Sequence, residues 1–197
     1  MVACHCDANA IMAVPFKSHK EKDHMVAYNT IMQRLKDRNM LVHLKILDNE
    51  ASKEYKTIIK EKWYIKYQLV PSNIHRQNAA ERAIQTFKAH LLSILAGVAD
   101  DLPRRHWDQL LPQAELTLNI LRQAKIKPEL SAWTYMMGAL NYDATTLGPL
   151  GCPLMIHKKT SNRKSWDFRS KERWSVGVSF EHSLWRSQKS QDRKSVV

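Results

Sequence analysis

Residues 71–88 read PSNIHRQNAAERAIQTFK, in which a polar, turn-rich segment leads into a helical pattern. Asn78 stands where a helix N-cap is expected, and Glu81 follows it three residues later. Apolar residues then recur at helical spacing, which predicts a helix over residues 78–96 with one buried face. The members of this apolar stripe are Ala80, Ile84, Phe87, Leu91 and Leu95.

Three polar side chains share a neighbouring face of this predicted helix. Glu81, Gln85 and Lys88 stand at positions i, i+4 and i+7, one above another. A carboxylate in the first turn, followed by an amide and a cation, could hold a metal ion beside a phosphate chain. The alternative is a capping box between Asn78 and Glu81, which periodicity alone favours.

A second carboxylate, Asp48, directly follows the apolar run at residues 44–47. The run predicts a buried strand over residues 41–47, and open α/β sheets place their sites at the carboxyl ends of such strands. A helix cap or an Asx turn is an equally good explanation of an aspartate at this position. Asp48 is therefore a candidate site residue with a structural alternative.

Several segments in a fixed order resemble the catalytic cores of retroelement integrases, with the nearest likeness to copia-type retrotransposons. The likeness covers roughly residues 4–182. The segments that carry it are LDNEAS (47–52), QLVP (68–71), HRQNAAERAI (75–84), WDQLLPQAELTLN (107–119) and KPELSAW (127–133).

The resemblance implies an α/β, ribonuclease H-like integrase core over residues 1–142. Composition and short β-like runs predict a small, basic, β-rich extension over residues 143–182, and the polar composition of residues 183–197 predicts a disordered tail. The parent activity is Mg²⁺-dependent (or Mn²⁺-dependent) DNA integration by polynucleotidyl transfer, and such cores can form homo-oligomers. In that activity Asp48 would be the second aspartate of an Asp-Asp-Glu triad and Glu81 its glutamate, and paired metal ions would activate the attacking and leaving oxygens.

The first aspartate of the triad has no counterpart in this sequence, because its strand would precede Met1. That strand would lie between the strands expected at residues 2–6 and 41–47. We therefore expect an N-terminally truncated core that binds metal weakly and is inactive alone. Asp7 does not replace the missing aspartate, since it stands in a predicted hairpin turn, Asp7-Ala8-Asn9.

The net charge of +12 indicates a nucleic-acid or other anionic partner and says nothing about the fold. Residues 151–197 hold eleven lysines and arginines against four acidic residues, interleaved with aromatic side chains, as in nucleic-acid surfaces. A non-enzymatic DNA-binding protein derived from an integrase and a structural remnant with incidental basicity remain alternatives. The predicted DNA contacts are Arg76, Gln85, Lys88, Lys158, Lys159, Arg163 and Lys164.

Composition excludes several other classes of protein. Three cysteines, an odd number, argue against a disulfide framework and for a reducing, intracellular compartment, which for a DNA-binding protein would be the nucleus. No apolar run approaches the ~18 residues of a membrane span, and no signal peptide is expected.

The rest of the chain alternates short strands with amphipathic helices. We expect a hairpin over residues 2–16 and a helix over 19–38 that ends at Asn39. The remaining expected elements are a helix over 53–62, a strand over 65–70, a helix with an apolar stripe from Trp107 to Leu121, a helix over 130–137, and β-like runs at 154–157 and 174–178.

Overall fold

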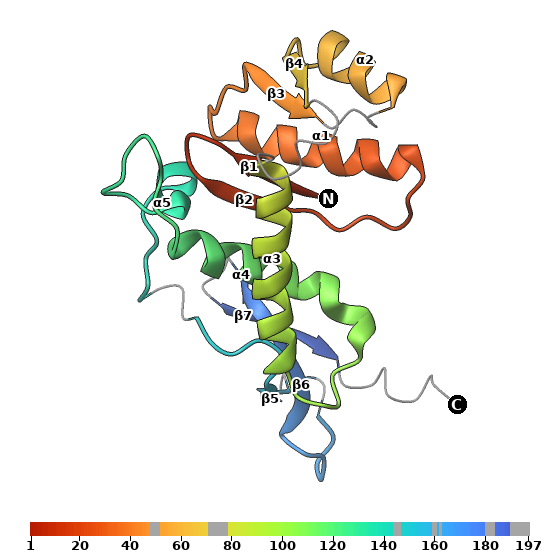
Figure 1. The fold of residues 1–197 in the computed structure, drawn as a ribbon. Coiled ribbons are helices and arrows are strands. Elements are labelled where there is room, and N and C mark those ends of the chain that lie inside the picture. Colours follow the sequence, from red (N-terminus) through yellow and green to blue (C-terminus); the bar gives the residue numbers. More distant parts are fainter. Residues whose placement is uncertain are drawn as a thin grey trace. The chain divides into compact units, whose positions relative to one another are not determined.

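The computed structural model describes residues 1–47, 52–70, 79–143, 147–158, 161, 163–179 and 184–189. These residues form helices together with parallel and antiparallel strand pairs, so the predicted α/β class is confirmed (Figure 1). In chain order the elements are β1 (Val2–His5), β2 (Ala10–Ala13), α1 (Glu21–Asp37), β3 (Leu44–Leu47), α2 (Lys53–Glu61), β4 (Lys66–Leu69), α3 (Ala79–Ala96), the 3₁₀ helix η2 (Arg104–His106), α4 (Trp107–Ile120), α5 (Ala132–Met137), β5 (Pro153–His157), β6 (Ser170–Ser179) and β7 (Leu184–Lys189).

The chain divides into two compact units, and neither is continuous in sequence. Unit 1 contains Met1–Lys88 and Leu118–Gly138, and unit 2 contains Ala89–Thr117 and Ala139–Val197. These units are defined by packing, and the domain boundaries expected from the sequence stay predictions.

In unit 1, β1 and β2 form the predicted antiparallel hairpin, with Val2 opposite Ala13 and His5 opposite Ala10. Asn9 has a φ of 52°, a left-handed conformation that asparagine tolerates in tight turns. Asp7 lies in this turn as expected, and its carbonyl accepts backbone hydrogen bonds from Lys125 and Ile126. The turn is thereby tied to a segment more than one hundred residues further along the chain.

The outer edge of β2 is covered by a side chain rather than by another strand. The Asn119 amide accepts a hydrogen bond from the Ile11 N–H (2.9 Å) and donates one to the Ile11 carbonyl (2.8 Å). Asn119 is only 3% exposed, so these bonds satisfy two backbone groups that are shielded from water. Arg122 adds bonds to the Asn9 carbonyl and side chain.

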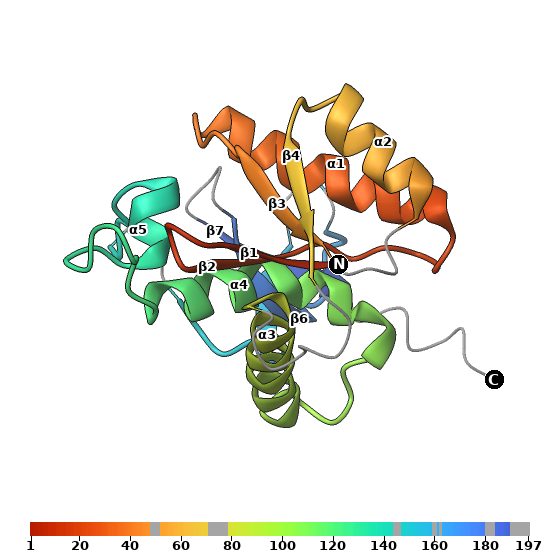
Figure 2. The same cartoon turned by 45° about the horizontal axis from the view of Figure 1, so that its top comes forward.

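The amphipathic helix α1 supplies half of the buried residues in the main core cluster of unit 1. The expected amphipathic helix is confirmed, since Tyr28, Ile31, Met32 and Leu35 on one face are buried. Asn39 follows the helix with a φ of 55°, as expected at a helix C-terminus. The helices α1 and α2 lie against the same face of β3 and β4, and Leu47, Ile59 and Ile65 join the α1 residues in one cluster (Figure 2).

Strands β3 and β4 are parallel, with Leu44 beside Lys66 and Leu47 beside Leu69. They form a sheet separate from β1 and β2, although Leu47 and Met12 belong to the same core cluster. Within the described part of unit 1, β1 and β3 therefore each pair along one edge only. Leu44 and Ile46 are about half exposed on β3, at 52% and 49%.

In unit 2, β5, β6 and β7 form an antiparallel sheet in that order. Trp174 and Val176 of β6 pack with Leu102, Leu110 and Leu150. Gly151 permits this packing, because its φ is +69° and a Cβ there would collide with the side chain of Val98.

The C-terminal tail differs from the expectation of disorder. Residues Leu184–Lys189 form β7, which pairs with β6 from Arg173–Lys189 to Ser179–Leu184. The prediction relied on the polar side chains of this segment, but a strand is joined to its sheet by backbone hydrogen bonds, which polar side chains permit. Residues 190–197 lie outside the described part of the chain.

The buried face of α3 also differs from the predicted stripe. Ala83 and Phe87 are buried, whereas Ile84 is 47% exposed. In α4 the inner residues of the stripe, from Leu110 to Leu118, are buried, whereas Trp107 is 42% exposed. Several apolar residues on each helix offer competing stripes, and the neighbouring elements select between them.

Candidate functional site

The first candidate site lies where the parallel strands end. Leu47 and Leu69 are partners at the carboxyl end of the β3–β4 pair, and Asp48 is the next residue after Leu47. A residue that follows a parallel strand is well placed for a site at the sheet edge. Asp48 and Arg76, together with the candidate cap Asn78, lie outside the described residues, so their contacts stay predictions.

Glu81 is placed in the first turn of α3, where the positive end of the helix dipole favours a carboxylate. Its side chain is partly buried, while Gln85 and Lys88, one and two turns further on, are exposed. The stacking of these three side chains on one side of the helix follows from their spacing. The position of Glu81 is thus described, and its role as a metal ligand stays a prediction.

The start of α3 lies near β1. Burial raises the pKa of the Cys4 thiol on β1, and the positive charge of Arg82 acts on the same thiol in the opposite direction. Arg82 is the neighbour of Glu81 in the sequence. The helix that carries Glu81 thus begins within electrostatic range of β1, which among the described residues pairs with β2 alone.

A third group in unit 1 was not predicted from the sequence. Lys45, on β3, donates a hydrogen bond to the Tyr55 hydroxyl (2.7 Å), and its Nζ lies 3.7 Å from the centroid of the Tyr28 ring. Burial lowers the pKa of Lys45 to about 7, and burial also raises the pKa of Tyr28 to about 12. The available signal was strand alternation, since Lys45 shares the inward face of β3 with Leu47.

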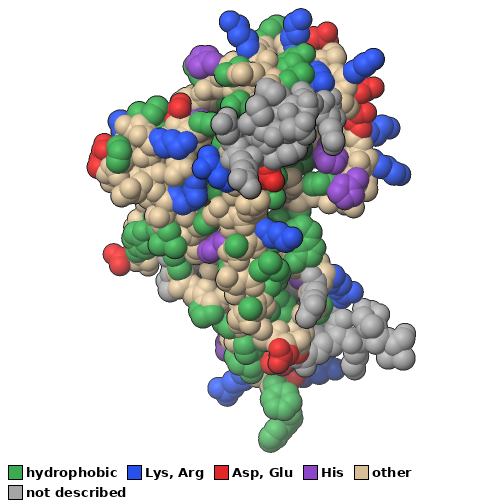
Figure 3. Space-filling model, viewed as in Figure 1, with side chains coloured by type: hydrophobic (Ala, Val, Ile, Leu, Met, Phe, Trp, Pro, Cys, Tyr) green, Lys and Arg blue, Asp and Glu red, His purple; other side chains and the backbone are tan. Residues whose placement is uncertain are grey.

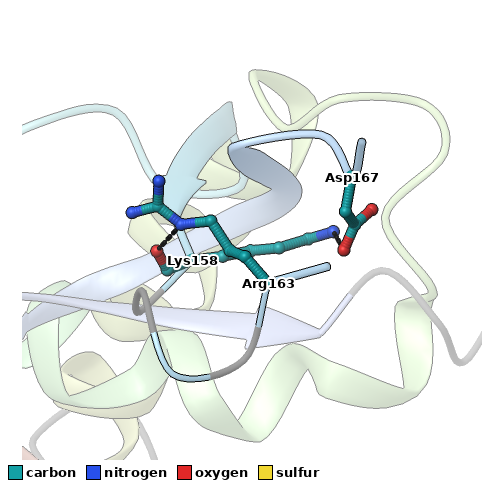
Figure 4. A network of polar contacts seen from close by, with 3 residues as sticks. All are labelled: Lys158, Arg163 and Asp167. Carbon is teal, nitrogen blue, oxygen red and sulfur yellow. Dashed lines mark hydrogen bonds and ion pairs between the residues drawn. The ribbon is translucent and has the colours of Figure 1, made fainter. Parts of the chain in front are cut away.

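Some of the predicted DNA contacts of unit 2 are engaged in contacts within the protein, and others are exposed. Lys158 pairs with Asp167 at 2.8 Å, and its side chain is only 12% exposed. Arg163 donates to the Lys158 carbonyl (2.8 Å; Figure 4). Arg163 also contacts the His157 ring. Lys164 is exposed and suited to a phosphate contact, whereas Lys159 lies outside the described residues.

Basic side chains are dispersed on the face shown in Figure 3. Lysine and arginine side chains stand there with acidic side chains between them rather than in one continuous patch. On this face, therefore, an anion-binding surface would be a local cluster of cations rather than one continuous basic patch.

The described residues do not contain a group of three or more His, Cys, Asp or Glu side chains that could hold a metal ion. Because Asp48 is outside those residues, the predicted Asp48–Glu81 pair is not tested by this finding. The three cysteines, Cys4, Cys6 and Cys152, are free thiols.

No protein-family profile matches the chain, and no curated protein matches it at a significant level. Among the described helices, none combines the length and the apolar character needed to cross a membrane.

Proposed function

We propose that the chain is a DNA-binding protein with the architecture of a ribonuclease H-like integrase core. The order of elements in unit 1 is the observation that supports this most: a hairpin, a helix, a strand, a helix and a strand parallel to the previous one. In the integrase fold that the chain resembles, one further strand would lie in the sheet between β1 and β3. The edges that such a strand would pair are unpaired in the described chain.

The chemistry of the parent activity depends on carboxylates. Asp48 and Glu81 would hold Mg²⁺ or Mn²⁺, and a bound metal would polarise a phosphate oxygen and activate the attacking hydroxyl. Asp7 does not complete a triad, because it is an exposed residue of the β1–β2 turn that is tied to Lys125 and Ile126. The proposed function is therefore DNA binding without strand cleavage, and self-association of the integrase kind belongs to the same proposal.

We expect duplex DNA binding to be strongly salt-dependent. Phosphate contacts release counterions, so each contact contributes about −0.9 to the slope of log affinity against log salt. The measurement is fluorescence anisotropy with a labelled duplex at several KCl concentrations, and we expect a slope of about −4 or steeper.

The matched variants compare two predicted contacts with two other exposed lysines. Lys88→Ala combined with Lys164→Ala is expected to weaken binding about tenfold and to reduce the slope by about 2. Lys22→Ala combined with Lys36→Ala removes the same charge from α1 and serves as the control. Salt-independent binding, or an equal loss in both double variants, would contradict the proposed interface.

Cleavage is a separate prediction. Purified protein incubated with supercoiled plasmid and Mn²⁺ should produce no more nicked circles than the Asp48→Asn and Glu81→Gln variants, because two carboxylates do not make the two-metal clamp. Nicking that both substitutions abolish would show that the chain is an enzyme and that another residue replaces the third ligand.

A further inference from the structure

The loop between β5 and β6 presents two aromatic rings to solvent. His157 and Ser170 are the last paired residues of the two strands, and residues 158–169 connect them. Trp166 is 100% exposed and Phe168 is 85% exposed. Large aromatic side chains contribute most to stability when they are buried, so this pair adds little to the folding of unit 2.

Internal contacts hold the loop that carries these rings. The Lys158 N–H donates to the Arg169 carbonyl (2.8 Å), which extends the strand pairing by one step. The Lys158 ammonium pairs with Asp167 (2.8 Å), and the Asp167 N–H donates to the Lys164 carbonyl (3.1 Å). Asp167, whose pairing with Lys158 is drawn in Figure 4, stands between Trp166 and Phe168 in the sequence. These contacts therefore constrain the backbone of the segment that carries both rings.

The electrostatics of the loop favour an anionic ligand. The Lys158 ammonium lowers the pKa of Asp167 by hydrogen bonding to its carboxylate, which compensates the only negative charge in residues 158–169. The side chains of Lys164, Arg169 and Lys171 are exposed, and each stands within three residues of Trp166 or Phe168 in the sequence. The loop thus combines flat apolar surfaces with cations at adjacent positions.

We infer that this loop binds unpaired nucleotides of a nucleic acid, with Trp166 and Phe168 stacking on bases and Lys164 and Arg169 contacting phosphates. Stacking on aromatic side chains is tolerant of sequence and requires bases that are free of a duplex. A lipid surface is the less favoured ligand, because the described part of the loop offers only two large apolar side chains among its cations. This inference rests on the proposed nucleic-acid-binding function. It adds that unit 2 recognises single-stranded rather than double-stranded nucleic acid.

The test compares a single strand with a duplex. The full chain is titrated into fluorescein-labelled dT20 and into a labelled duplex of the same length, and anisotropy gives both affinities. Trp166→Ala combined with Phe168→Ala should weaken dT20 binding about 10- to 100-fold and duplex binding less than about twofold. Trp166→Phe should retain most of the affinity, because a ring remains to stack.

Tyr142→Ala is the matched control, since Tyr142 is a 59% exposed aromatic residue of the same unit outside the loop. It should change dT20 binding less than about twofold. Circular dichroism and thermal melting of each variant establish that the exposed substitutions leave the fold intact.

The outcomes separate the two proposals. Unchanged dT20 binding in the double variant, or an equal loss for dT20 and duplex, would overturn the stacking assignment while duplex binding by the wild-type protein still supports the proposed function. If the double substitution weakens dT20 binding and the wild-type protein does not bind the duplex, the stacking assignment is supported and the duplex proposal is overturned. If the wild-type protein binds neither DNA, both proposals are overturned. Binding to phosphatidylserine vesicles is measured for the same variants. If the double variant loses vesicle binding while its dT20 binding is unchanged, the rings belong to a membrane-binding surface.

Discussion

Replacing Asn119 with alanine should lower the free energy of unfolding of the protein by about 3 kcal/mol. The substitution leaves the N–H and carbonyl of Ile11 without partners in a buried environment, and each unsatisfied group costs about 1–3 kcal/mol. It also removes a well-packed side chain that is only 3% exposed. Urea unfolding followed by circular dichroism measures the change.

Asn141→Ala is the control for this prediction. Asn141 is exposed and accepts a local hydrogen bond from the Asp143 N–H, so its loss should cost less than about 0.5 kcal/mol. A loss below about 1 kcal/mol for Asn119→Ala would show that water or another group satisfies the edge of β2.

Replacing Lys45 with methionine should remove a pH dependence of stability. The folded-state pKa of Lys45, about 7, is far below the unfolded value of 10.5, so the unfolded chain binds more protons between these pH values. The free energy of unfolding of the wild type should therefore rise with pH over this window. The titration of Lys45 should account for a rise of about 2 kcal/mol between pH 7 and 9. Methionine keeps the apolar stem and does not titrate.

The measurement is the difference in free energy of unfolding between Lys45→Met and wild type at several pH values from 6 to 9. The variant should be relatively more stable at pH 6 and lose that advantage as the pH rises. Taking the difference cancels other groups that titrate in this window, such as the Met1 amino group, whose pKa burial lowers. Lys66→Met, at an exposed position on β4, controls for the loss of a positive charge, and identical pH profiles for both variants would refute the prediction.

The sequence predicted elements whose signals are local. The amphipathic helix α1 follows from periodicity, and the turn at Asn9 and the helix end at Asn39 follow from residues that adopt left-handed backbone conformations. The parallel pairing of β3 and β4 agrees with the strand–helix–strand pattern at residues 41–70.

What the sequence did not predict depends on contacts between distant segments. The role of Asn119 requires Ile11 to lie beside it, 108 residues away. The Lys45–Tyr28–Tyr55 group joins one strand to two helices, and nothing local distinguishes its lysine from a surface lysine. Of the two predicted carboxylates of the candidate site, the structure describes the position of Glu81 but not that of Asp48.

The hydrogen bonds of Asn119 also affect the order of events during synthesis. The β1–β2 hairpin is translated before Asn119, and Ile11 gains its partner only after the ribosome has added more than one hundred further residues. At ordinary elongation rates this delay is roughly 5 to 20 seconds. Throughout that interval the nascent hairpin exposes a strand edge, so we expect a dependence on chaperones that would be absent if the edge were covered by a neighbouring segment.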